Sequence, residues 1–368
     1  MVGIDIGGAN IKLALWLSPN LAPHCSAQPF ALWKHPDELG KTVAASIAQL
    51  LSTVPKSYSD IDAGPPDRLA VTMTGELADC YATRAEGVAR ILEQLRLVMP
   101  SEQIDVYAVG EQWLTPSEAV DDPWRVAASN WHALATWLGR WNEDVRLSPQ
   151  AVLVDIGSTT VDIIPMRGGC CASDAQTDRQ RLVRSQLVYT GMARTPICAI
   201  TSHLELRGES VPVMAEWFAT SDDAYLALSL VEEDPLDRAT ADQRPRTAVC
   251  ARARLARMVG EDDQTLTVDE LNHIAHQIVD SQARSVAGAI DENLQWLAKH
   301  NDIIPTQARL PRLISTGHGG PLLERACRYI KTPHVEPVPA WQCDSLAMRC
   351  APAVAVAYLR ASTNRSAR

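Results

Sequence analysis

Short apolar runs alternate with amphipathic stretches along the first part of the chain. The apolar runs at 68–74 and 105–110 predict buried strands. Apolar residues recur at helical spacing over three stretches, which predicts helices at 37–51, 84–99 and 126–141. Strands and helices that alternate in this way are typical of an α/β domain.

The same kind of pattern starts again after residue 150. Residues 151–166 predict two strands around a tight turn, and 309–327 predict a strand, a glycine loop and a helix. Between them, 267–300 predict one long helix, with a capping box formed by Thr267 and Glu270. The pattern therefore predicts a second α/β domain.

The restart sets the domain boundaries that we expect. The first domain is predicted over 1–148 and the second over 149–345. A final helix over 346–361 is expected to pack back on the first domain. A length of 368 residues is comfortable for two domains of this size.

Both predicted domains open with an apolar–Asp–x–Gly turn. The first is "VGIDIGGANIKLAL", 2–15, and the second is "VLVDIGSTTVDII", 152–164, so that Asp155 falls 150 positions after Asp5. Glycine permits a tight turn and close approach of a ligand, and successive backbone N–H groups can converge on an anion. A late "STGHGG", 315–320, would place further N–H groups at the start of a helix.

These turns supply the candidate phosphate-binding residues. One turn alone is most often only a tight hairpin, but two of them with a late glycine loop favour phosphate binding. An aspartate would repel phosphate by itself, so Asp5 and Asp155 predict Mg²⁺ ligands that act largely through water. The predicted phosphate-binding residues are Asp5, Gly7, Gly8, Asn10, Gly157, Ser158, Thr159, Thr160, Gly317, Gly319 and Gly320.

Composition narrows the classes of partner. A net charge of −10 argues against nucleic acid or an anionic membrane as the main partner, since both need a basic surface. The nine cysteines include no CxxC pair, which favours free thiols in a reducing cytoplasm over a zinc site. We find no signal-type segment before Val2 and no apolar run of membrane-spanning length, so a soluble cytoplasmic protein is expected.

"IDIGGANIK", "DIGSTTVDIIP" and "ISTGHGG" resemble, in order and spacing, the phosphate and adenosine motifs of the actin, heat-shock chaperone and sugar kinase superfamily. The resemblance implies two ribonuclease-H-like domains, α/β in class, that face each other across a phosphate-binding cleft. "TMTGELADC", "LVYTGMARTP", "TADQRP" and "ARARLARMVG" are similar to a hydantoinase/oxoprolinase-related branch of that superfamily. In that branch we would expect Gly-Glu where Ser185-Gln186 stands here, and Gly where Gln243 stands.

The branch implies a transferase in methanofuran biosynthesis, within tetrahydromethanopterin-linked one-carbon metabolism. Its substrates would be an aminomethylfuran diphosphate and a phenolic acceptor of the γ-glutamyltyramine or tyrosine type. Diphosphate would leave, with Mg²⁺ as cofactor and ATP possible but not required. The residues implied are Glu76 and Asp79 as candidate bases, Lys12 as a catalytic cation, and Arg181, Tyr189 and Arg194 as contacts to the acceptor.

Several alternatives stay open on the sequence. Glu76 and Asp79 are equally well explained as caps of the helix that follows, and Arg181 and Arg194 as salt bridges. An ATP-dependent small-molecule kinase, or a hydantoinase/oxoprolinase-type hydrolase of the same fold, is the alternative function. A nucleotide-gated switch is a third, less favoured one.

Overall fold

The structure is a computed structural model that describes residues 1–18, 21–54, 66–141, 150–300, 311–332, 337–339 and 345–363. The chain divides into two compact units. The first comprises Met1–Ala151, Ile164–Val183 and Pro339–Arg368, and the second comprises Val152–Ile163 and Arg184–Val338. The domain boundary predicted at residue 148 lies outside the described residues.

The first unit is built on a six-stranded sheet of order β3-β2-β1-β4-β5-β6. β1, β2 and β3 are antiparallel neighbours, whereas β1, β4 and β5 run parallel. The strands are β1 (Val2–Ile6), β2 (Asn10–Leu15), β3 (His24–Pro29), β4 (Leu69–Met73), β5 (Ile104–Ala108) and β6 (Gln112–Leu114). The helices of this unit are α1 (Leu39–Ser52), α2 (Arg84–Arg96), α3 (Pro116–Asp121), α4 (Asn130–Trp141), α6 (Asp178–Val183), α12 (Ser345–Arg349) and α13 (Ala351–Thr363).

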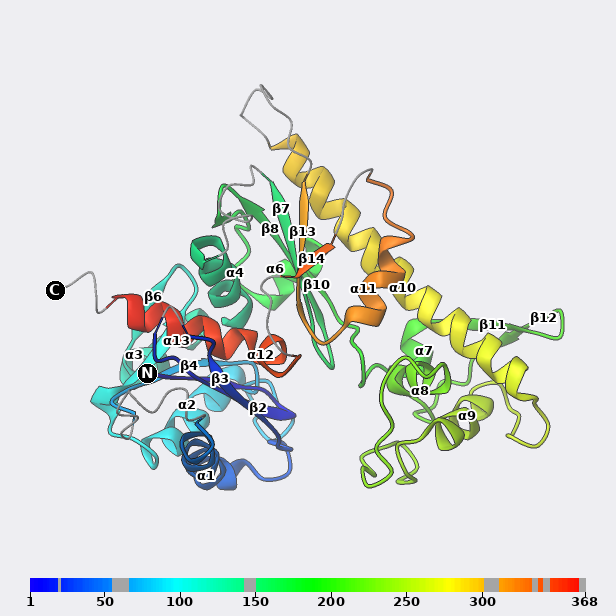
Figure 1. The fold of residues 1–368 in the computed structure, drawn as a ribbon, viewed down its shortest axis with the longest axis horizontal. Helices are drawn as coiled ribbons and strands as arrows, with labels where there is room; N and C mark the ends of the chain where they lie inside the picture. Colours follow the sequence, from blue (N-terminus) through cyan, green and yellow to red (C-terminus); the bar gives the residue numbers. More distant parts are fainter. Residues whose placement is uncertain are drawn as a thin grey trace. The chain divides into compact units, whose positions relative to one another are not determined.

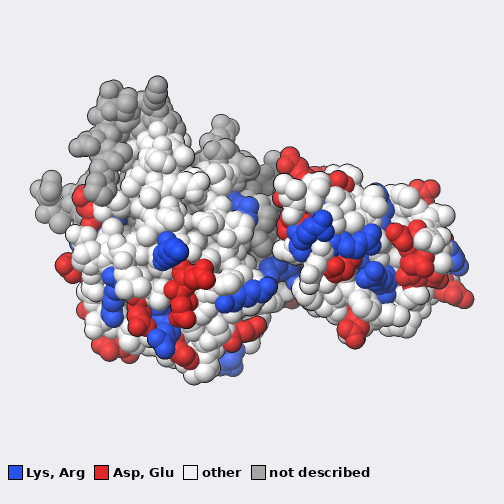
Figure 2. All heavy atoms as spheres, turned by 90° about the horizontal axis from the view of Figure 1, so that it is seen from below, with Lys and Arg blue, Asp and Glu red and all other residues white. Residues whose placement is uncertain are grey.

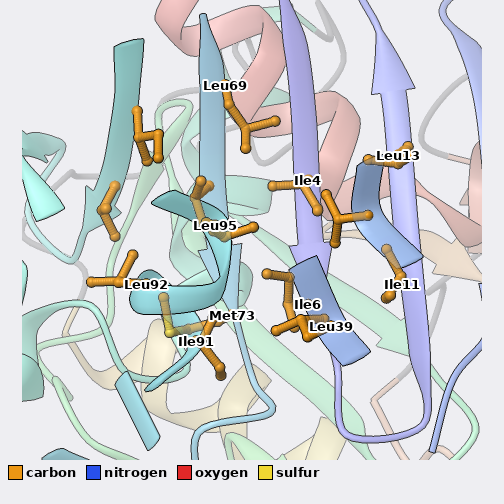
Figure 3. Packing of buried hydrophobic residues seen from close by; sticks show 14 of the residues in the cluster. Ile4, Ile6, Ile11, Leu13, Leu39, Leu69, Met73, Ile91, Leu92 and Leu95 are labelled. Carbon is orange, nitrogen blue, oxygen red and sulfur yellow. The ribbon is translucent and has the colours of Figure 1, made fainter. Parts of the chain in front are cut away.

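Side chains alternate between the two faces of this sheet. Ile4 and Ile6 of β1 point into a core that α1 and α2 complete with Leu39 and Ile91 (Figure 3). On the opposite face α13 packs on β1 and β4 (Figure 1). Gly3 makes this close approach possible, because a Cβ there would lie 2.1 Å from the carbonyl oxygen of Ala353.

The second sheet has the order β10-β8-β7-β13-β14, with a short β9 paired to β8. Most of it is formed by the second unit, whereas β9 and the part of β8 from Ile164 on belong to the first. Its strands are β7 (Ala151–Ile156), β8 (Val161–Arg167), β9 (Cys170–Cys171), β10 (Leu187–Val188), β13 (Arg312–Gly317) and β14 (Pro337–Pro339). Two more strands, β11 (His203–Leu206) and β12 (Glu209–Pro212), form a separate hairpin. The helices are α7 (Ile197–Ile200), α8 (Ser221–Ala227), α9 (Ala248–Arg257), α10 (Val268–Lys299) and α11 (Gly320–Cys327).

The strand order repeats between the two sheets. When the strands of each sheet are numbered by their order in the chain, the first sheet reads 3-2-1-4-5, followed by β6. The second sheet reads 3-2-1-4-5 as well, once β9 and the β11–β12 hairpin are left out of the numbering. This is the order of a ribonuclease-H-like domain, so the predicted fold class and its internal duplication are confirmed. The capping box of Thr267 and Glu270 at the start of α10 is also confirmed.

The surface and the helices add two observations. Acidic and basic side chains are interspersed over the face drawn in Figure 2. Among the described residues, no helix has both the length and the apolar character needed to cross a membrane.

Candidate functional site

The first glycine turn is a closed hairpin that places a carboxylate next to an ammonium group. The N–H of Gly7 donates to the carbonyl oxygen of Asn10 at 2.9 Å, which closes the turn between β1 and β2. Asp5 and Lys12 are cross-strand partners, and the Lys12 Nζ donates to Asp5 Oδ2 at 3.1 Å. Asp5 is only 1% exposed, and its Oδ1 has no hydrogen-bond partner within the described part of the chain.

Two segments hold this turn in place. The N–H groups of Phe30 and Leu32 donate to the carbonyl oxygens of Ala9 and Gly8, respectively, both at 3.0 Å. From the other side Gly75 donates its N–H to the carbonyl oxygen of Ile6 at 2.9 Å. The "TMTGELADC" block, which the sequence linked to the phosphate motifs only by resemblance, therefore lies directly against the first hairpin.

The C-terminal segment contributes a cation that the sequence analysis missed. Arg349, at the end of α12, donates from Nη2 to Asn10 Oδ1 at 3.3 Å. The two residues are 339 positions apart, so that no local pattern marks them as neighbours. Lys12 and Arg349 thus give this hairpin two cationic side chains beside the single carboxylate of Asp5.

The second glycine turn repeats the first. The N–H of Gly157 donates to the carbonyl oxygen of Thr160 at 2.9 Å. Asp155, the counterpart of Asp5, accepts at Oδ1 from the Thr316 hydroxyl at 2.7 Å. The hydroxyls of Ser158, Thr159 and Thr160 make no hydrogen bond to any described residue and are half-buried.

Residues 189–194, which follow β10 and are called the strap below, lie across the second turn. Residues 30–32, which follow β3, lie across the first turn in the same way. The N–H groups of Ala193 and Arg194 donate to the carbonyl oxygen of Ser158, both at 3.0 Å. Gly191 lies flat on the same peptide, because a Cβ there would lie 2.6 Å from Thr159 N. Gln282 of α10 fixes the strap by donating to the Gly191 carbonyl oxygen at 2.8 Å.

Two predicted acceptor-binding residues, Tyr189 and Arg194, lie on this strap. Both side chains are exposed, Tyr189 by 64%. The third, Arg181, belongs to the first unit and is 2% exposed. Its guanidinium lies over the Trp131 ring at 4.4 Å, and an incoming carboxylate would have to compete with that packing. The assignment of all three to substrate binding stays a prediction.

The late glycine loop packs against the end of β7. Gly317 has φ +81°, and a Cβ there would lie 2.3 Å from the carbonyl oxygen of Ile156. His318 donates its N–H to that oxygen at 3.1 Å, which matches the bond from Gly75 to Ile6 in the first unit. A Cβ on Gly319 would overlap the Ile156 side chain, whereas Gly320 borders open space. Close packing therefore accounts for Gly317 and Gly319, and Gly320 has room for a ligand.

Glu76 is a buried acid with a raised pKa. It is 1% exposed, and its Oε2 has no hydrogen-bond partner among the described residues. Burial raises the pKa of Glu76 to about 7, against the opposing effects of nearby backbone N–H groups and of Arg84, while Asp178 raises it further. A carboxyl that titrates near neutrality in a buried position is the usual form of a general base or acid.

The alternative role of Glu76 and Asp79 as caps is wrong for α2. The N-cap of α2 is Thr83, whose hydroxyl accepts from the Glu86 N–H at 3.1 Å. Asp79 is exposed in the turn before it. Of the two candidate bases, Glu76 is therefore the buried one and Asp79 the exposed one.

The described residues contain no cluster of three or more His, Cys, Asp or Glu side chains that could hold a metal by themselves. Mg²⁺ does not require such a cluster, because it usually keeps several waters and takes one or two carboxylates with substrate phosphates. The unpartnered Oδ1 of Asp5 fits that mode of binding. The site residues described here thus form two hairpins of one design, one in each unit, with Glu76 beside the first.

A duplicated ribonuclease-H-like fold with an Asp–x–Gly hairpin in each unit defines the class of protein. A model of the hydantoinase/oxoprolinase family matches residues 67–362. The chain is 32% identical over 309 residues to a (4-{4-[2-(gamma-L-glutamylamino)ethyl]phenoxymethyl}furan-2-yl)methanamine synthase of Methanocaldococcus jannaschii, covering 83% of this chain and 85% of that protein. The chain belongs to the hydantoinase/oxoprolinase family.

Other similarities are shorter or more distant. A synthase of the same name from Methanococcus vannielii is 32% identical over 129 residues, which cover 35% of this chain and 58% of that protein. Among solved structures, a ROK family glucokinase from Streptomyces griseus in complex with glucose and AMPPNP has 13% identity and a TM-score of 0.45, with 98% of each chain covered. A nucleotide-free acetone carboxylase has 13% identity and a TM-score of 0.47, covering 89% of this chain and 46% of that one.

Proposed function

We propose that this protein is a transferase of methanofuran-type cofactor biosynthesis that joins an aminomethylfuran diphosphate to a phenolic acceptor and releases diphosphate. The observation that carries the proposal is the match to the M. jannaschii synthase, which spans most of both chains. The acceptor is of the γ-glutamyltyramine or tyrosine type. ATP is not consumed in this reaction.

The product named for that relative defines the bond that has to form. A phenoxymethyl-furan is an aryl ether, in which a phenol oxygen is bonded to a methylene on the furan ring. The furan ring stabilises positive charge on that methylene. Loss of diphosphate therefore breaks the methylene–oxygen bond, with the electron pair leaving on diphosphate. The phenol oxygen forms the new bond, and its proton passes to a base.

The first hairpin supplies groups suited to the leaving diphosphate. Lys12 and Arg349 carry positive charge beside the turn, and charge that develops on the departing oxygens is stabilised by fixed cations. Asp5 in the first unit and Asp155 in the second are each suited to hold Mg²⁺, which when bound would add Lewis-acid stabilisation of the same charge. In the second hairpin the hydroxyls of Ser158 and Thr159 are suited to donate to phosphoryl oxygens.

Glu76 is assigned as the base that accepts the phenol proton. An unperturbed phenol has a pKa near ~10, so that a positioned base lowers the barrier to its deprotonation. Oε2 is the acceptor atom, because it has no other partner among the described residues. Oε2 is buried in this structure, so the phenol can reach it only after a local rearrangement around Glu76.

The reaction can be tested directly with purified protein. The furan diphosphate, tyramine or γ-glutamyltyramine and Mg²⁺ are expected to yield the aryl ether and one equivalent of diphosphate, measured by mass spectrometry. O-methyltyramine is the matched control, because it keeps the ring and the amine but has no phenol proton to lose. Release of ADP from ATP, with no ether formed from the furan diphosphate, would instead favour the kinase or hydrolase function.

The variant Glu76→Gln separates catalysis from binding in the same assay. It is expected to lower kcat by about 100-fold or more, which is the usual scale for loss of a general base. Diphosphate affinity should hardly change, because Gln keeps the shape of the side chain. An unchanged kcat would remove Glu76 from the chemistry.

A further inference from the structure

The carboxylate of Glu76 shares a single cation with a second acid. Arg84, in the first turn of α2, places Nη1 3.7 Å from Glu76 Oε1. The same guanidinium donates from Nη2 to Asp178 Oδ2 at 2.5 Å. Asp178 opens α6, 94 residues further along the chain, and it is the nearer of the two acids to Arg84.

Asp178 is itself held in place from a second side. Arg181, one turn further along α6, brings Nη1 to 4.0 Å from Asp178 Oδ1. Arg181 is fixed by the Trp131 ring of α4, over which its guanidinium lies at 4.4 Å. Asp178 thus lies between two guanidinium groups, those of Arg84 and Arg181.

The backbone of Glu76 is fixed by the helix that carries Arg84. Gly87 of α2 lies on the Glu76 peptide so closely that a Cβ there would lie 2.1 Å from the Glu76 carbonyl oxygen. The same helix therefore sets both the position of the acid and the position of the cation. The distance between Glu76 and Arg84 is therefore set by the packing of α2 on the Glu76 peptide.

The contacts of Glu76 differ from those of a carboxylate in a purely structural salt bridge. Buried ion pairs are tolerated when both carboxylate oxygens are satisfied, because a buried and unpaired charge is costly. Here Asp178 holds the close contact, and Glu76 has one distant cation and an Oε2 that no described residue contacts by a hydrogen bond. Glu76 therefore receives only part of the stabilisation that Arg84 can give to an anion.

We propose that Arg84 and Asp178 are positioning residues for Glu76: Arg84 holds its carboxylate, and Asp178 takes the closer share of the same guanidinium, which leaves Glu76 available as a base. This inference rests on the proposed function for its role in catalysis. The charged groups that face Glu76 are Arg84 from α2 and Asp178 from α6. They act on it in opposite directions.

The test is to remove each partner and follow the proton affinity of Glu76. In Asp178→Asn the second acid is lost and Arg84 becomes available to Glu76, so that the pKa of Glu76 should fall by about one unit. In Arg84→Met the cation is lost and the pKa should rise by a similar amount. The readout is the carbon-13 titration of glutamate carboxyls in the unliganded protein, with Glu76→Gln to assign the resonance.

The pH dependence of kcat/KM is a second readout, and the direction of its shift can be stated in advance. A base acts only when it is ionised, so kcat/KM should rise with pH through the pKa of Glu76. The rising part of the pH profile is expected to move to lower pH in Asp178→Asn and to higher pH in Arg84→Met. Arg84→Lys should restore most of the wild-type position, since it keeps the charge.

Matched controls make each outcome decisive. Asp280→Asn removes a similar acid from an Arg ion pair in the second unit, with Arg325 at 2.7 Å, and should leave the Glu76 resonance where it is. Shifts in the same direction for Asp178→Asn and Arg84→Met, or no shift in either, would overturn the inference. Opposite shifts without any ether formation would instead refute the proposed function and leave the arrangement around Glu76 intact.

Discussion

At the scale of single residues, backbone conformation explains the two departures from the family pattern. Ser185 and Gln243 stand where the resemblance predicts glycine, and both have positive φ, at +53° and +58°. This region favours glycine, because a Cβ there approaches the neighbouring backbone. Both positions therefore hold a residue other than glycine in a conformation that glycine adopts most easily.

This strain predicts the effect of restoring glycine. Ser185→Gly and Gln243→Gly should each raise the free energy of unfolding by about 0.5–1 kcal/mol, the relief of left-handed strain less the entropy of a freer unfolded chain. Thermal unfolding is the measurement. Ser285→Gly, in the middle of α10, is the control and should destabilise, since glycine weakens a helix. A loss of stability in both test variants would show that the positions are not strained.

At the scale of elements, the sequence predicted those whose pattern is local. The helices α1, α2 and α10 and both hairpins follow from apolar spacing, capping residues and glycine turns. The strand β3 was missed, because "HCSAQP" has no alternation of apolar and polar residues and none of its residues is fully buried. The helix α9 was missed as well, since it includes Arg254, a charged residue that is completely buried between Asp223 and Asp242.

The contacts that complete the site depend on long-range packing. Arg349 meets Asn10, and Arg84 meets Asp178, through parts of the chain that carry no shared motif. The sequence could name the hairpins and Glu76 as candidates. It could not show that Gly7 and Gly157 use their own N–H groups to close the turns, nor that Gly317 and Gly319 serve packing.

The strap on the second hairpin makes a prediction of its own. Gly191→Ala would place a Cβ 2.6 Å from Thr159 N, so that the strap has to lift away from the Ser158 peptide. Overpacking of this kind costs about 1–3 kcal/mol, and the displaced turn should bind diphosphate more weakly. Calorimetric titration with Mg²⁺ and diphosphate measures the affinity, and thermal unfolding measures the stability.

Gly288→Ala is the matched control for this variant. Gly288 lies in the middle of α10, where a Cβ meets no atom within 4 Å. Alanine is about 1 kcal/mol more favourable than glycine inside a helix, so this variant should be more stable with an unchanged affinity. If Gly191→Ala behaved like Gly288→Ala, the strap would have no part in shaping the second hairpin.

At the scale of the whole molecule, one architectural unit has been used twice. The strand order, the closed Gly turn, the strap after the third strand and the threonine–glycine segment after the fourth recur in both units. The two copies differ in the chemistry around their aspartates. Asp5 contacts a lysine, whereas Asp155 accepts from a threonine hydroxyl. The backbone is therefore duplicated while the side chains around the two aspartates have diverged, so the two hairpins are suited to different partners.

A double-mutant cycle tests whether the two hairpins act on one ligand. Asp5→Asn and Asp155→Asn should each weaken binding of Mg²⁺ and diphosphate by about tenfold or more, since each removes a carboxylate proposed to hold the metal. If both residues act through the same bound ion, the double variant should lose less than the sum, with a coupling energy of about 1 kcal/mol or more. Titration of diphosphate without Mg²⁺ is the control and should show no loss of affinity in any variant, since the removal of a carboxylate also removes its repulsion of the anion. Strictly additive losses would mean two independent sites, one for each hairpin, whereas coupling of this size would mean that both aspartates act on one bound ion.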